Sequence, residues 1–142
     1  MAVRLTINKQ HIEAKEETIL HSIPCKIHGD EIANVSKYFT PYIRKNDDKN
    51  FDGSFRGYPL NGTIIKIPEG YKGVTFYEQN KPEDPKIKRE LVSTGGFTNF
   101  TYWNYDKLPS KNDAIIGALN WIDIAEALHS TTDDDADVNG SS

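Results

Sequence analysis

The sequence predicts a mainly β domain of barrel-like architecture with one or two helices at its C-terminal end. Three observations support this fold class. Short apolar–polar alternations recur along residues 3–77, a strongly aromatic segment covers residues 97–105, and helical spacing appears only after residue 109. A length of 142 residues fits one domain. We therefore expect a single β-barrel-type domain over residues 1–129 and a disordered acidic tail over residues 130–142.

The first third of the chain predicts three strands. Residues 3–7 alternate apolar and polar side chains, which is the period of a strand with one buried face. Residues 19–27 repeat the alternation and would bury Cys25, which raises the pKa of a thiol and makes it inert. Residues 35–43 would form a third strand, at an edge or a bulge because Pro41 cannot donate a ladder hydrogen bond.

The middle of the chain predicts a hairpin, a short strand and a long loop. Residues 51–67 would form the hairpin around Asn61 and Gly62, since both residues of a type I′ turn accept positive φ. Residues 74–77 predict the short strand. Residues 78–96 are polar, with two prolines and a Gly-Gly pair, so we expect a flexible surface loop there.

The aromatic segment and the C-terminal region predict a covered strand followed by a helix. Five of the nine residues from Phe97 to Tyr105 are aromatic, and large rings occupy both alternating positions. Such rings pack in a core or a protein interface, or they stack on single-stranded bases. Ser110 and Asn120 are candidate helix starts, each followed three residues later by Asp, and apolar residues at helical spacing continue to about His129.

The charge and the cysteine content exclude several function classes. Residues 1–129 contain 17 basic and 17 acidic residues, so this part is a weak candidate for tight electrostatic binding of nucleic acid or anionic membrane. One cysteine cannot form an intrachain disulfide. No apolar run approaches the length of a membrane span, and no signal peptide is visible, so we expect a reducing, intracellular compartment and no membrane partner.

No constellation of residues predicts catalysis, a metal or a cofactor bound by this chain. His21, Cys25 and His28 are too few for a zinc site, and a strand places Cys25 and His28 on opposite faces. We interpret them as a buried cysteine and two surface histidines. The acidic residues fall in polar turns, such as residues 46–50, rather than in a packed metal site at strand ends. No Gly-rich phosphate loop occurs.

Three segments nevertheless resemble one known family. They are HSIPCKI followed by KYFTPYIR within residues 21–44, GSFRGYPLNGTIIKIPEGYKG at residues 53–73, and FTYWNYDKLPSKNDAIIGALNWIDIAEALH at residues 100–129. Their combination and order are specific, and the chain resembles the C subunit of the eukaryotic type 2 ribonuclease H. Two features depart from the family. Tyr58 stands where a basic residue is usual, and the loop over residues 78–96 does not align.

The resemblance implies a non-catalytic structural subunit of a heterotrimer. In this family the C subunit interleaves its strands with those of the B subunit in a triple-barrel heterodimer. The pair supports the catalytic A subunit, which is expected to use Mg²⁺. The trimer cleaves RNA in RNA–DNA hybrids and removes ribonucleotides embedded in genomic DNA. The resemblance therefore implies a role in DNA replication and repair and a location in the nucleus.

The resemblance also implies interface residues, which are hypotheses. Barrel side chains would form a shared core with the B subunit, two helix residues would pack the C-terminal helix on the barrel or on a neighbour, and Arg56 would bind a partner oxygen or lie in solvent. The full set is Phe39, Pro41, Phe55, Arg56, Leu60, Tyr102, Trp103, Trp121 and Leu128. The alternative function is a standalone β-barrel module that binds single-stranded nucleic acid through Phe100, Tyr102 and Trp103.

Overall fold

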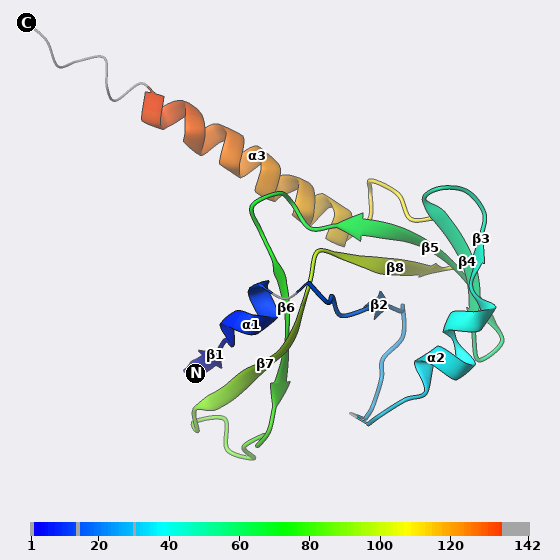
Figure 1. Ribbon diagram of the computed structural model, residues 1–142, viewed down its shortest axis with the longest axis horizontal. Helices are drawn as coiled ribbons and strands as arrows, with labels where there is room; N and C mark the ends of the chain where they lie inside the picture. Colours follow the sequence, from blue (N-terminus) through cyan, green and yellow to red (C-terminus); the bar gives the residue numbers. More distant parts are fainter. Residues whose placement is uncertain (1, 14, 30, 135–142) are drawn as a thin grey trace, which may run out of the picture.

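Two β-sheets and a long C-terminal helix make up the fold in a computed structural model that describes residues 2–13, 15–29 and 31–134 (Figure 1). One sheet has three strands in the order β1-β7-β6, and the other has five in the order β2-β8-β5-β4-β3. The predicted mainly β fold with a C-terminal helix is confirmed. The sheets of the described chain stay open and do not close into a barrel.

The three-stranded sheet brings the start of the chain next to its middle. β1 (Val3–Thr6) pairs in parallel with β7 (Arg89–Phe97), and β6 (Gly73–Glu78) pairs antiparallel with the other side of β7. α1 (Lys9–Glu13) is tied to β7 by Ser93, whose buried hydroxyl lies 2.8 Å from Nδ1 of a histidine in that helix. Both β1 and β6 are edge strands, each with one side that no described strand covers.

The five-stranded sheet holds the hydrophobic core. Its strands, in spatial order, are β2 (His21–Ser22), β8 (Asn99–Tyr105), β5 (Tyr58–Lys66), β4 (Asn50–Phe55) and β3 (Arg44–Lys45). β2 runs parallel to β8, and the other neighbours are antiparallel. The aromatic strand predicted over residues 97–105 is β8 together with the end of β7. The core of the described chain is centred on this strand, at Trp103.

Trp103 fits into the core because two facing positions are glycine. A Cβ on Gly62 would lie 2.6 Å from Cε3 of the indole, and a Cβ on Gly53 would lie 3.3 Å from its far edge. On the other side, Phe39 meets the indole edge to face, with ring centroids 5.6 Å apart. β4 and β5 therefore pass directly over the indole, and neither glycine can carry a side chain without a displacement.

The turn between β4 and β5 lies at Arg56 and Gly57, so the predicted turn at Asn61 and Gly62 is wrong. Both turn residues have positive φ, 49° and 81°, as a type I′ turn requires. Asn61 and Gly62 lie inside β5 and pair with β4. The Asn-Gly pair was misleading as a turn signal. Gly62 has no side chain because the indole of Trp103 packs against it, and not because the chain turns there.

The strand predicted over residues 35–43 is also wrong. This segment forms the short helix α2 (Val35–Tyr38) and the 3₁₀ turn η1 (Thr40–Tyr42). Pro41 lies at the beginning of η1, where its missing N–H removes no helical hydrogen bond. The helical turns place the ring of Phe39 on the core from outside the sheet.

Two predicted extents need correction. The strand over residues 19–27 is reduced to β2, and Cys25 lies beyond it with an exposed side chain, so the burial argument for an inert thiol does not apply. The loop over residues 78–96 is shorter than predicted, because β7 begins at Arg89. The Arg89 guanidinium donates hydrogen bonds of 2.7 and 2.6 Å to both carboxylate oxygens of Glu78, which closes the loop at its base.

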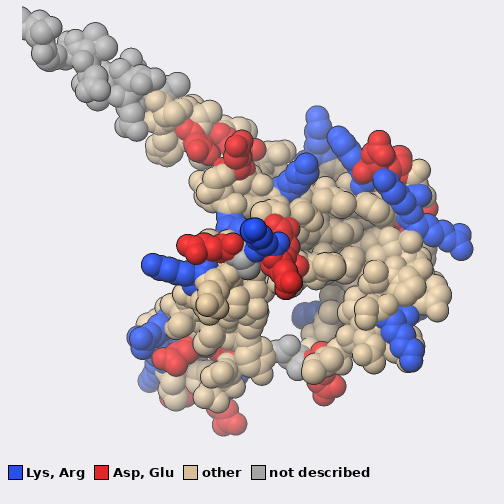
Figure 2. Space-filling model, in the orientation of Figure 1, with Lys and Arg blue, Asp and Glu red and all other residues tan. Residues whose placement is uncertain are grey.

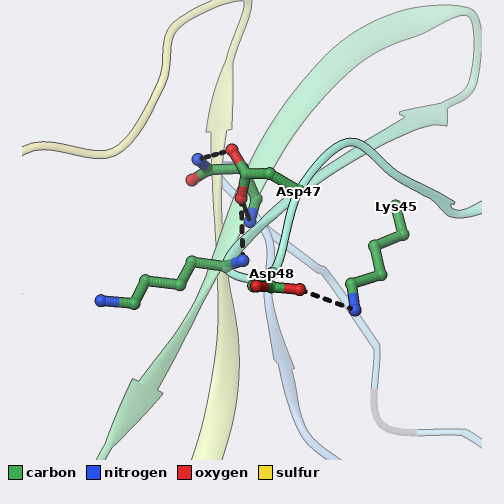
Figure 3. A network of polar contacts seen from close by, with 5 residues as sticks. Lys45, Asp47 and Asp48 are labelled. Carbon is green, nitrogen blue, oxygen red and sulfur yellow. Dashed lines mark hydrogen bonds and ion pairs between the residues drawn. The ribbon is translucent and has the colours of Figure 1, made fainter.

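The polar turn predicted between β3 and β4 is confirmed (Figure 3). The Asp47 carboxylate accepts the backbone N–H groups of Lys49 and Asn50, at 2.8 Å each, and the side-chain amide of Asn50 at 2.7 Å. These hydrogen bonds lower the pKa of Asp47. Asp48 forms an exposed ion pair with Lys45, with an N–O distance of 3.7 Å. Both carboxylates are thus occupied by contacts at this turn.

α3 (Ala114–Asp134) begins four residues after Ser110, the first of the two predicted starts. The backbone carbonyl of Asp113 accepts the N–H of Gly117 at 3.0 Å, and its side chain accepts the backbone N–H of Ser110 at 3.0 Å. Asn120, the second predicted start, lies inside the helix.

α3 also continues past His129, where the sequence predicted its end. Residues 130–134 of the expected disordered tail are helical, and residues 135–142 lie outside the described residues. In Figure 1 the helix runs away from both sheets, so that its far end stands clear of them.

Candidate subunit interface

The described residues do not bring potential metal ligands together. Among them, no group of three or more His, Cys, Asp or Glu side chains is placed to hold a metal ion. A hydroxyl and an imidazole do meet at Ser93 and His11, but Ser93 is only 4% exposed and also accepts the backbone N–H of Asn8. No described helix is both long and apolar enough to cross a membrane.

Four of the predicted interface residues meet in the core of this chain. Phe39, Leu60 and Trp103 are buried, and Phe55 packs against them partly buried. The indole of Trp103 has no exposed surface, so bases cannot stack on it. The alternative function, a stacking platform for single-stranded nucleic acid, therefore loses one of its three rings.

His21 belongs to this cluster, so the prediction that it is a surface histidine is wrong. The indole N–H of Trp103 donates a hydrogen bond of 3.1 Å to Nδ1 of His21. The His21 ring also meets Phe39 edge to face, with centroids 5.2 Å apart. Burial lowers the pKa of His21 and favours the neutral ring that can accept this bond. Sequence reasoning could have anticipated such a contact, because a buried indole N–H needs a hydrogen-bond acceptor nearby.

The other predicted interface residues lie apart from one another. Pro41 and Arg56 are exposed in two different turns, and the guanidinium of Arg56 lies 5.7 Å from the centroid of the Phe55 ring. Tyr102 is partly buried on β8, where burial and the nearby Asp113 carboxylate raise its pKa. The two helix residues, Trp121 and Leu128, have exposed side chains.

Large apolar side chains are also exposed in several regions outside the predicted interface set. Ile19 and Ile32 are 83% and 100% exposed. Residues 3–7, which include the edge strand β1, add three half-exposed aliphatic side chains. Apolar surface of this extent is typical of a chain that a protein partner covers.

A groove of about 1200 Å³ separates the five-stranded sheet from the first turns of α3. Ile65 lines it from the sheet side, and Ile116 and Leu119 line it from the helix. Lysines and acidic residues border the same groove at Lys49, Lys66, Lys111, Glu69 and Asp123. The mixed charges give it no strong preference for one kind of ion.

Comparison with known families favours one of the open interpretations. The family described as ribonuclease H2 non-catalytic subunit (Ylr154p-like) matches residues 19–90 and 78–128. The chain belongs to this family. It is similar to the C subunit of ribonuclease H2 from Bos taurus, with 27% identity over 92% of this chain and 96% of that protein. It is similar to the corresponding C subunit from Mus musculus at 27% identity, over 82% and 83% of the two chains.

A third relative comes from a yeast. A Schizosaccharomyces pombe protein described as uncharacterized is 30% identical over 75% of this chain and 79% of its own. Membership confirms the resemblance predicted from the three segments, and it makes the chain an accessory subunit of a ribonuclease H2 complex. The exposed apolar surface of the described chain fits a protein that works as part of an assembly.

Proposed function

We propose that this chain is the structural C subunit of a heterotrimeric type 2 ribonuclease H, which pairs with the B subunit and supports the catalytic A subunit. The family match over most of the chain carries this proposal. Such a trimer cleaves RNA in RNA–DNA hybrids and removes single ribonucleotides from genomic DNA. The chain itself contributes shape and contact surface, and no catalytic group.

The three-stranded sheet is the proposed place of pairing with the B subunit. Its edge strands β1 and β6 each have one side that no described strand covers. Val3 and Leu5 on β1 are about half exposed. Strands of the partner added to these edges would satisfy the backbone hydrogen bonds and cover the aliphatic side chains, which would complete shared barrels.

The chemistry is proposed to belong to the A subunit, with Mg²⁺ held by its own carboxylates. In this chain, the adjacent carboxylates of Asp47 and Asp48 are engaged in a turn and an exposed ion pair. The proposed location is the nucleus, where genomic DNA is the substrate.

Reconstitution tests this proposal. The full chain is co-expressed with the B and A subunits of its own organism, purified through a tag on this chain, and assayed on a DNA duplex that contains one ribonucleotide. We expect cleavage by the trimer and none by this chain or by its pair with the B subunit. A chain that recovers neither subunit, or a trimer without this activity, would contradict the proposal.

Salt dependence separates the proposal from the alternative function. A chain that binds single-stranded nucleic acid by itself loses affinity steeply as salt rises. We expect the chain alone to show no such binding at about 50 mM salt, because residues 1–129 carry no net charge and Trp103 is buried.

A further inference from the structure

The two sheets are joined where the chain passes from one to the other at Thr98. β7 ends directly before this residue and β8 begins directly after it, so one continuous stretch changes sheet there. β5 and β6 change sheet beside it through residues 67–72, and the backbone N–H of Ile67 donates a hydrogen bond of 2.8 Å to the carbonyl of Thr98. In the part of the chain that the structure describes, no strand of one sheet pairs with a strand of the other. Figure 2 shows an open space between the two parts of the molecule away from this bend. Contacts at the bend therefore set the angle between the sheets.

A third segment, residues 17–20, crosses the bend and contacts both sheets. The backbone N–H of Thr18 donates a hydrogen bond of 2.9 Å to the carbonyl of Gly96 on β7. The carbonyl of Leu20 accepts the backbone N–H of Thr101 on β8 at 3.0 Å. A Cβ at Gly95 would overlap the hydroxyl of Thr18, so the glycine allows the segment to lie this close. The Gly-Gly pair that was expected in a flexible loop thus permits close packing at the bend.

The side chain of Glu17 connects the three segments at the bend. Its Oε1 accepts the hydroxyl of Thr98 at 2.5 Å, and the ammonium of Lys72 lies 3.7 Å from the same oxygen. The side chains of Glu17 and Lys72 are 34% and 22% exposed, so the cluster is partly covered. The hydrogen bond from Thr98 and the charge of Lys72 lower the pKa of Glu17, which keeps the carboxylate ionised at neutral pH. One ionised carboxylate therefore contacts both of the other segments that join the sheets.

We propose that Glu17 is a clamp that fixes the angle between the two sheets and preorganises the chain for pairing with the B subunit. The preorganisation rests on the proposed function, because it requires that partner. Large side chains are exposed on both sheets, among them Leu5 on β1 and Tyr105 on β8. A partner that covers both sheets at once can bind the chain at one angle only. Without the clamp, fewer molecules have this angle, and the apparent affinity falls in proportion to their fraction.

Pulsed electron spin resonance measures the angle in the full chain without a partner. Ser54→Cys places one spin label on β4 and Glu90→Cys places a second on β7, both at exposed positions, and Cys25→Ser removes the native thiol. We expect one narrow distribution of distances between the labels. Glu17→Gln combined with Thr98→Val keeps the shapes of both side chains but removes the charge and the hydroxyl. This variant should broaden the distribution at least about twofold, because other angles become populated.

The neighbouring Glu16→Gln is the matched control for the clamp. Glu16 is exposed on the same segment, so its substitution should leave the distribution narrow. Far-UV circular dichroism should be the same in all variants, because each sheet keeps its own backbone hydrogen bonds. A narrow distribution in the Glu17 and Thr98 variant would overturn the clamp. A loss of strand signal in that variant would also overturn it, since the two sheets would then not be folded independently of the clamp.

Binding to the B subunit tests the consequence for assembly. The Glu17 and Thr98 variant should bind about 10-fold more weakly if about a tenth of the molecules have the competent angle, and Glu16→Gln should change affinity less than about twofold. Normal affinity of the variant would overturn the preorganisation and leave the proposed function standing. A wild-type chain that does not bind the B subunit, together with a broadened distribution in the variant, would overturn the proposed function and leave the clamp between the sheets standing.

Discussion

Trp103 is enclosed by glycine on one side and by two rings on the other, so the space beside it controls stability. In Gly62→Ala, the new Cβ would lie 2.6 to 2.8 Å from three atoms of the indole. Because β5 and β8 pair directly at this point, the strain cannot be relieved by a side-chain rotation. We expect a loss of about 1–3 kcal/mol in the free energy of unfolding, measured by urea denaturation.

The same substitution at Gly117 is the control for this prediction. Apart from its chain neighbours and the backbone of its own helix, no described atom lies within 4 Å of a Cβ built at Gly117, and the residue is inside α3. Gly117→Ala should therefore raise stability by about 0.5–1 kcal/mol. If Gly62→Ala is as stable as the wild type, the indole does not lie where the structure places it.

His21 predicts a pH dependence of stability. Burial lowers its pKa in the folded chain below the ordinary value of 6.5, so the unfolded chain binds a proton first as the pH falls. The neutral His21 ring contributes its full share to the free energy of unfolding above about pH 6.5. This share is lost as the pH falls below that value, because a protonated Nδ1 cannot accept the indole N–H of Trp103.

Replacement of His21 by phenylalanine tests this dependence. His21→Phe keeps a ring beside Phe39 but removes both the acceptor and the titration. We expect lower stability at about pH 7.5, by about 1–3 kcal/mol, and a smaller further loss down to about pH 5 than in the wild type. Thermal unfolding at a series of pH values measures both effects, with the exposed His28→Gln as control. Equal pH slopes in His21→Phe and the wild type would exclude the role of His21.

At the scale of the elements, the orientation of α3 depends on one side chain of β8. Asn104→Ala removes the hydrogen bond to Asp113 and leaves the bond from Ser110 in place. We expect the helix to remain formed, with a loss of about 0.5–1.5 kcal/mol in stability and faster hydrogen exchange in residues 114–118. Unchanged exchange there would show that packing in the groove alone orients the helix.

The elements that sequence alone could predict are those set by local pattern. Alternation in residues 3–7 predicted β1, the run of rings predicted β8, and the Ser110 region predicted the start of α3. α2 and the turn at Arg56 were missed because their conformations depend on contacts with the core. Phe39 reaches the indole only from a helical turn, and Gly62 is required by the indole rather than by a hairpin loop.

At the scale of the whole molecule, the sequence could identify the family but could not separate an internal core from an interface. Phe39, Leu60 and Trp103 were grouped with Trp121 because large apolar residues serve both environments. The structure separates them, since the first three are buried in the chain and Trp121 is exposed. Only a three-dimensional arrangement shows which apolar residues already have neighbours within the chain.

The stability of the chain should also depend on its partner. Ile19, Ile32 and the edge strands of the described chain are exposed, so a partner that covers them binds only the folded state. Such binding adds about 2.7 kcal/mol to stability when the free partner is about 100-fold above Kd, which raises the melting temperature by roughly 8–12 °C for a chain of this size.

Thermal unfolding of the full chain at fixed concentration, with increasing B subunit, measures this shift, and bovine serum albumin at the same concentrations is the control. A melting temperature that does not respond to the B subunit would mean that the exposed apolar surface is not what the partner covers.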